Sequence, residues 1–152
     1  MANVNHSTLA DQYLHEPKGV VSASSGDVYL ANGSGSGTWT SRQSMLTVQF
    51  PDISSASNLY VPIPYAGTIT KIQSALTAAI SGGDAVFTIT NSSGSSMGTL
   101  TITQSGSAAG DVDTLTPSSN NTVTAGTFIK IACNGGPSSH VEACLVICVD
   151  GS

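Results

Sequence analysis

The stretch LYVPIPYAGTITKIQSAL, residues 59–76, decides the fold class of this chain. Its first half alternates, so that Leu59, Val61 and Ile63 point to one side of an extended backbone and the residues between them to the other. This period of two is typical of a half-buried β-strand. Pro62 and Pro64 have no N–H to donate to a neighbouring strand, so they restrict this strand to the edge of a sheet or themselves to its non-bonded side.

The second half of the same stretch predicts a turn and another strand. Residues 65–68, Tyr-Ala-Gly-Thr, are expected to reverse the chain, with Gly67 adopting a positive φ. Residues 69–76 then form a second extended run, which we expect to make the central pair with the first. A two-stranded element with one apolar face is not stable alone in water, so further strands must cover it.

The rest of the chain supplies such strands. They are predicted at residues 45–50, 85–90, 99–103, 111–115, 123 with 128–133, and 141–149. Short segments rich in Gly, Ser, Asn and Pro separate them, and residues 134–137 are expected to close a hairpin. Only residues 73–80 leave room for a short helix. The pattern predicts an all-β protein, a β-sandwich of jelly-roll-like type.

The N-terminal part has a different composition, which predicts an extended arm over residues 1–40 and a sandwich over residues 41–152. The arm has few large apolar residues and no helical period. Within it, residues 19–22 and 27–31 are predicted to pair as short strands, and residues 32–37, Asn-Gly-Ser-Gly-Ser-Gly, to form a flexible linker. An arm this poor in apolar residues cannot build its own core, so we expect it to be disordered or laid along a partner.

Charge is scarce in this chain. Charged residues make up 9% of the sequence, against about 25% in ordinary soluble domains. The net charge is −5, and the only basic residues, Lys18, Arg42, Lys71 and Lys130, are scattered. Because a nucleic-acid partner requires a basic face, direct binding of DNA or RNA is not expected. No run of ~20 apolar residues predicts a membrane span, and the start lacks the pattern of a signal peptide, so assembly in a cytoplasm is expected.

The three cysteines are interpreted as small buried apolar residues. Their odd number does not suit a disulfide framework. Cys144 and Cys148 lie on one face of a predicted strand, roughly 13 Å apart, and cannot bond to each other there. A zinc site with His140 as a further ligand is the alternative, but the spacing from Cys133 onward matches no zinc motif.

Several other residues suggest chemistry by their letters alone. Residues 94–98 match G-x-S-x-G, but the segment links two predicted strands rather than a strand and a helix, which favours a plain turn. His140 and Glu142 share a strand face and are interpreted as a solvated pair. Asp111 and Asp113 also share a face, where calcium is an alternative, although no full ligand set is apparent. No cofactor or metal is therefore expected.

Two long segments carry a resemblance to phage proteins. HEPKGVVSASSGDVYLANGSGSGTWT, residues 15–40, resembles a module of tailed-bacteriophage structural proteins in which H-x-x-K-G leads to G-x-V-Y-x-A-N-G-x-G-S-G-x-W. PIPYAGTITKI, residues 62–72, with GSAAGDVDTLTP and NTVTAGTFIKI, is similar to a β-sandwich domain of phage head decoration or head-fibre proteins. The resemblance implies binding to the outside of a capsid, often as a trimer at quasi-threefold positions.

The resulting expectation is a capsid decoration (cement) protein on the outer surface of a virion, made in the host cytoplasm and not an enzyme. Its expected partners are the major capsid protein and two further copies in a homotrimer. The arm offers these candidate capsid-binding residues: His15, Glu16, Lys18, Val20, Tyr29 and Leu30. His15 and Glu16 are interpreted as a docking contact rather than a catalytic pair.

Aromatic residues supply the candidate subunit contacts, namely Trp39, Tyr60 and Tyr65. Trp39 has two interpretations, a cap on the edge of the sandwich core or an anchor at a subunit contact, where tryptophan is enriched. Tyr60 and Tyr65 also carry the alternative function, a receptor- or carbohydrate-binding module of a phage head fibre or tail fibre. A hydrolase is the third hypothesis, which the sequence hardly supports.

Overall fold

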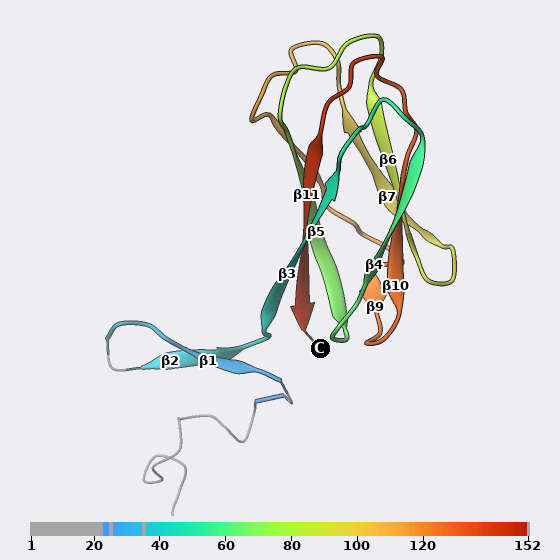
Figure 1. The fold of residues 1–152 in the computed structure, drawn as a ribbon. Helices are drawn as coiled ribbons and strands as arrows, with labels where there is room; N and C mark the ends of the chain where they lie inside the picture. Colours follow the sequence, from blue (N-terminus) through green and yellow to red (C-terminus); the bar gives the residue numbers. More distant parts are fainter. Residues whose placement is uncertain (1–22, 25, 35, 152) are drawn as a thin grey trace, which may run out of the picture. The chain divides into compact units, whose positions relative to one another are not determined.

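The computed structural model describes residues 23, 24, 26–34 and 36–151 (Figure 1). Every regular element in these residues is a β-strand. The chain divides into two compact units, one ending at Arg42 and the other spanning Gln43–Gly151.

The described part of the first unit is a β-hairpin. Strand β1 (Val28–Ala31) runs antiparallel to β2 (Gly37–Thr40), with Tyr29 opposite Trp39. The sequence predicted a different partner for β1, residues 19–22, which lie outside the described residues. The expected pairing with residues 19–22 therefore stays a prediction, and among the described residues β1 forms its ladder with β2.

Hydrogen bonds among Asn32, Ser34 and Ser36 order the turn of this hairpin, so the prediction of a flexible linker is wrong. Asn32 donates its backbone N–H to the carbonyl oxygen of Ser36 at 2.8 Å. Its side-chain Oδ1 accepts hydrogen bonds from the backbone N–H groups of Ser34 and Ser36. An asparagine side chain that bonds its own following backbone is a standard turn device, and composition alone does not reveal it.

The second unit is a sandwich of two antiparallel sheets (Figure 1). One sheet has the order β4-β10-β6-β7 and the other β3-β11-β5-β8, with the short β9 paired to β5. The first sheet consists of β4 (Ser57–Pro62), β10 (Phe128–Cys133), β6 (Ala85–Asn91) and β7 (Ser96–Ile102). The second consists of β3 (Gln43–Phe50), β11 (Ala143–Gly151), β5 (Gly67–Leu76), β8 (Val112–Leu115) and β9 (Thr122–Val123).

The connectivity makes this sandwich jelly-roll-like, as the sequence predicted. Along the chain, β3, β4, β5 and β6 alternate between the two sheets, and the first and last strands of the unit, β3 and β11, are neighbours. Two interleaved sets of antiparallel strands of this kind are the hallmark of the jelly roll. Residues 73–80, the stretch that left room for a short helix, form none, because β5 continues to Leu76 and a loop follows it.

Two predicted pairings of consecutive strands are wrong for this reason. β4 and β5 belong to different sheets, so residues 63–66 cross from one layer to the other instead of closing a hairpin. Residues 134–137 likewise cross between β10 and β11. Asn134 accepts the backbone N–H of Val86 with its Oδ1, which ties this crossing to the start of β6 rather than to a hairpin partner. The prediction that β4 lies at a sheet edge is confirmed.

The core lies between the sheets and is almost wholly aliphatic. Ala143, Leu145, Ile147 and Val149 alternate along β11 and are all buried, as predicted. Phe50 of β3 and Phe87 of β6 meet edge to face across the two layers, with ring centroids 5.1 Å apart. Such an arrangement is favoured for aromatic pairs, so this contact helps to fix how the sheets stack.

Gly67 has a different role from the one expected. Its φ is not positive, and it is the first residue of β5, paired with Gly151 of β11 and Val123 of β9. A side chain at Gly67 would collide with the backbone carbonyl oxygen of Asp150. The glycine is therefore required for the close approach of β5 to β11.

Candidate interaction surfaces

The candidate capsid-binding residues fall into two groups. His15, Glu16, Lys18 and Val20 lie outside the described residues. Tyr29 and Leu30 lie on β1 of the hairpin. These assignments remain predictions, and the structure adds the surroundings of the last two residues.

The hairpin is held together by an aromatic pair and exposes aliphatic side chains. The rings of Tyr29 and Trp39 lie 5.3 Å apart at an angle of 60°. Trp39 is half-buried. Its contact with Tyr29 lies within the hairpin, whereas the two interpretations from the sequence placed Trp39 on the edge of the sandwich core or at a subunit contact. Val28 and Leu30 alternate with Tyr29 along β1 and are exposed, Leu30 by 58%. Exposed aliphatic side chains on such a small element are suited to contact with a partner.

Tyr60 lies on the outer face of β4. It is exposed, and its ring meets that of Phe128 on β10 edge to face, with centroids 5.3 Å apart. This pair adjoins an open groove of about 480 Å³ between β3 and β4, lined by residues 45–49 and 59–62. The groove was not expected from the sequence, because the chain gives no indication that β3 and β4 border the same side of the sandwich.

Tyr65 lines a different hollow from Tyr60. It lies in the crossing between β4 and β5 and is also exposed. Its neighbours around a small hollow include Leu46 and Val149. The role of both tyrosines in a subunit contact remains a prediction.

The cysteines differ in burial, which corrects the expectation for two of them. Cys133 is buried, and burial raises the pKa of its thiol. Cys144 and Cys148 are only half-buried, because they lie on the outer face of β11, opposite to its core residues. They line a shallow hollow of about 280 Å³ whose other lining residues include Met45 and Val112. All three cysteines are free thiols.

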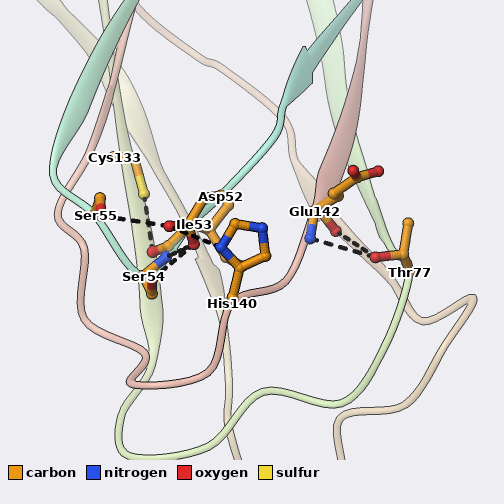
Figure 2. Close-up of polar contacts among 8 residues, drawn as sticks. All are labelled: Asp52, Ile53, Ser54, Ser55, Thr77, Cys133, His140 and Glu142. Carbon is orange, nitrogen blue, oxygen red and sulfur yellow. Dashed lines mark hydrogen bonds and ion pairs between the residues drawn. The ribbon is translucent and has the colours of Figure 1, made fainter.

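A polar cluster surrounds Asp52 in the loop after β3 (Figure 2). Asp52 Oδ1 accepts the backbone N–H and the hydroxyl of Ser54 at 2.8 and 2.6 Å. Its Oδ2 lies 3.2 Å from Nδ1 of His140. The hydrogen bonds from Ser54 are the main cause that lowers the pKa of Asp52, and His140 lowers it further.

This cluster differs chemically from a Ser-His-Asp triad. In a triad the imidazole stands between the hydroxyl and the carboxylate, so that it can take the serine proton. Here the carboxylate of Asp52 stands between Ser54 and His140 (Figure 2). The serine hydroxyl therefore points at an anion that orders the loop. Figure 2 also shows the hydroxyl of Thr77, which donates to the backbone carbonyl oxygen of Glu142 and accepts from its backbone N–H, a structural contact between two neighbouring loops.

The expected solvated pair of His140 and Glu142 is not a pair, because each has its own partner. His140 contacts Asp52, and the Oε2 of Glu142 accepts a hydrogen bond from Nε2 of Gln49 at 2.9 Å. The predicted turn at residues 94–98 is confirmed as a connection between strands β6 and β7. The second strand, however, already begins at Ser96, so Met97 joins the core.

Asp111 and Asp113 flank the start of β8. Asp111 Oδ2 accepts the backbone N–H of Ala108 at 2.6 Å. Burial, together with the charge of Asp111, raises the pKa of Asp113. Within the described ranges, no group of three or more His, Cys, Asp or Glu side chains is placed to hold a metal ion. No helix of the described residues is long and apolar enough to cross a membrane.

No protein-family model matches the chain, and no curated protein matches it. Among solved structures, it is similar to that of Bacillus endospore appendages, which form a novel family of disulfide-linked pili, with 15% identity over 74% of this chain and 90% of that chain and a TM-score of 0.39. It is also similar to a virus-like particle of the giant freshwater prawn (Macrobrachium rosenbergii) extra small virus, with 13% identity over 73% of this chain and 80% of that chain and a TM-score of 0.33. TM-scores this low assign no function to the present chain.

Proposed function

We propose that this chain is a structural protein of a bacteriophage particle that decorates and stabilises the outer surface of the capsid. Support comes from the resemblance of residues 15–40 to a module of phage structural proteins and from the β-hairpin that β1 and β2 form within that segment. The observation that carries the proposal is the exposure of Val28 and Leu30 on a hairpin that belongs to a different unit from the sandwich.

The proposed partner is the major capsid protein, and the proposed oligomer is a homotrimer. A trimer presents three hairpins to the lattice of coat subunits, so that the second and third contacts form at a high effective concentration. Weak individual contacts then suffice for firm attachment. The net charge of −5 keeps the protein away from polyanions, and the proposal includes no nucleic acid, membrane or cofactor.

Co-sedimentation of the purified protein with undecorated capsids tests this function. Leu30→Asp places a charge on the exposed face of the hairpin and should weaken binding at least tenfold, because a carboxylate must then be desolvated. Val112→Asp is the matched control, since Leu30 and Val112 are both 58% exposed but lie in different units. Equal binding by Leu30→Asp and wild type would remove the hairpin from the proposal.

Deletion of residues 1–42 provides the complementary test. The sandwich, residues 43–151, holds the core residues and should keep the circular dichroism of a folded β-protein. It should also lose capsid binding. Undiminished binding by the folded, truncated protein would contradict the proposed anchor.

The pair of Tyr60 and Phe128 favours a second candidate function, carbohydrate recognition by a head-fibre or tail-fibre module. Sugars stack on exposed aromatic faces, and this pair adjoins the groove of about 480 Å³. Saturable binding on a glycan array that Tyr60→Ala abolishes would support it. Absence of any saturable glycan signal would leave capsid decoration as the sole proposal.

A further inference from the structure

The two sheets of the sandwich have four edges, formed by β3, β4, β7 and, together, β8 and the two-residue β9, and all except the β3 edge carry devices that discourage pairing with another chain. β4 ends in Pro62, which has no N–H to donate. β7 contains a register shift opposite Ile89 and Thr90 and a glycine, Gly98, at φ 137°. β8 is only four residues long and carries Asp113. Prolines, bulges, short length and charge are the usual protections of a sheet edge.

The fourth outer strand, β3, carries none of these. Its sequence, QSMLTVQF, has eight residues with no charge and no proline. Its register with β11 is continuous from Gln43, opposite Asp150, to Phe50, opposite Ala143. In an antiparallel edge strand, the N–H and C=O groups of about every second residue point away from the sheet. β3 therefore offers a regular row of backbone donors and acceptors.

The sandwich is also open along β3. The groove of about 480 Å³ runs between β3 and β4, and Leu46, Val48 and Leu59 beside it are only partly buried. On the opposite side, a side chain at Gly98 of β7 would meet Leu115 of β8 at 2.9 Å, so the two sheets close against each other there. Met45, on the outer face of β3, is 73% exposed.

We propose that β3 pairs antiparallel with β3 of a second copy of this chain, so that two sheets join into one continuous sheet across a twofold axis. Backbone groups supply the affinity, as in other cases of strand addition. An isologous contact needs a strand that is complementary to itself. β3 meets this condition, because two uncharged strands bring no like charges together even though each chain carries −5 overall.

The length of β3 sets the register. A pair centred on Thr47 places residues 44–50 of the two copies opposite each other, which is nearly the whole strand. This twofold contact goes beyond the proposed decoration function, and it does not depend on the proposed trimer. In a trimeric protein it would link one trimer to the next.

The mass of the full-length protein in solution, from light scattering after size exclusion, tests the contact. Thr47→Lys puts two like charges opposite each other on the axis and should halve the mass of the wild-type particle. Thr101→Lys is the matched control, because Thr101 is an exposed threonine on another outer strand, β7, and should leave the mass unchanged. An equal mass for wild type and Thr47→Lys would overturn the proposal.

Cross-linking gives an independent measurement with the full chain. Single cysteines at positions 45, 47 and 49 should be introduced into a Cys144→Ser/Cys148→Ser background, because Cys148 lies opposite Met45 and Cys144 opposite Gln49 within one chain. Opposed residues of antiparallel strands lie about 4.5–5.5 Å apart at Cα, within reach of a disulfide.

Oxidation should then produce covalent dimers, and no larger species, from the position-47 variant alone and from a mixture of the position-45 and position-49 variants, because residue 45 of one copy faces residue 49 of the other in this register. Cysteine at position 101 should produce none. Absence of dimers at all three β3 positions would show that another segment covers β3, either of the same chain or of a coat subunit, and would overturn the proposal.

Discussion

Replacing Tyr29 by alanine should unfold the hairpin of β1 and β2 while leaving the sandwich intact. Tyr29 faces Trp39 across the hairpin at 5.3 Å, and aromatic pairs contribute about 0.5–1.5 kcal/mol beyond the burial of their surface. An isolated two-stranded hairpin is marginally stable in water. Losing about 1 kcal/mol therefore lowers its folded fraction severalfold, since this amount changes the ratio of folded to unfolded molecules about fivefold.

The chain offers a clean readout of this effect, because Trp39 is its single tryptophan. Trp39 fluorescence in a urea titration should report the hairpin, and far-UV circular dichroism should report the sandwich. Tyr29→Ala should shift the emission of Trp39 to longer wavelength in the absence of urea and leave the sandwich transition unchanged. Binding to capsids should fall by about the same factor of five, because only the folded hairpin binds.

Tyr60→Ala is the matched control for this experiment. It removes an aromatic pair with the same centroid distance, 5.3 Å, but one that lies within the sandwich. It should lower the midpoint of the sandwich transition and leave Trp39 emission unchanged. If Tyr29→Ala and Tyr60→Ala shift both signals together, the hairpin is not an independent unit and the reasoning is refuted.

Three further predictions concern the sandwich. Ser74→Ala should raise the free energy of unfolding by about 1 kcal/mol, because the buried Ser74 Oγ has no hydrogen-bond partner among the described residues. The control, Ser107→Ala, removes hydrogen bonds to Ile80 and Gln104 and should lower the free energy of unfolding by about as much. A loss of stability in Ser74→Ala would contradict this prediction. Asp52→Asn should destabilise the protein at neutral pH. The pKa of Asp52 is lowered on folding, so its contribution to stability is present above the usual aspartate pKa of about 4 and is lost as the pH falls through the lower pKa of the folded state. The difference in unfolding free energy between variant and wild type, measured by chemical denaturation, should therefore shrink over that acidic range. A difference that stays constant with pH would argue against this cause. A disulfide reagent should modify Cys144 and Cys148 in the native protein and Cys133 only after unfolding, and rapid native modification of all three would be inconsistent with the burial of Cys133.

The sequence allowed the strands and their inward faces to be predicted, because alternation is a local property. Leu145 and Ile147 on β11, and Phe87 and Ile89 on β6, are buried as their period of two required. The prolines of residues 59–64 correctly indicated an edge strand, since a missing N–H restricts a strand wherever it lies.

The pairing of strands was not predictable in the same way, because it depends on contacts between distant residues. Neighbouring strands along a chain usually pair, and this expectation failed for β4 with β5 and for β10 with β11, where the jelly roll sends consecutive strands to opposite sheets. The turn at Asn32 was mistaken for a linker because Gly and Ser dominate its composition, while a single amide side chain orders it.

The surfaces that carry the proposals were only partly visible in the sequence. The arm drew attention to Tyr29 and Leu30, but the partner of Tyr29 became known only through the register of the hairpin. The only local indication of the exposed edge of β3 was the lack of charged residues in QSMLTVQF. This lack suggests a contact with another chain only once β3 is known to be an outer strand.

Cryo-electron microscopy of the intact particle that carries this chain tests the central claim most directly. The account predicts density for the hairpin, with the side chains of Val28 and Leu30 in contact with coat subunits and the sandwich on the outer side of the shell. Density for the sandwich on the shell with a hairpin that touches no coat subunit, or density for the chain elsewhere in the particle, would contradict it.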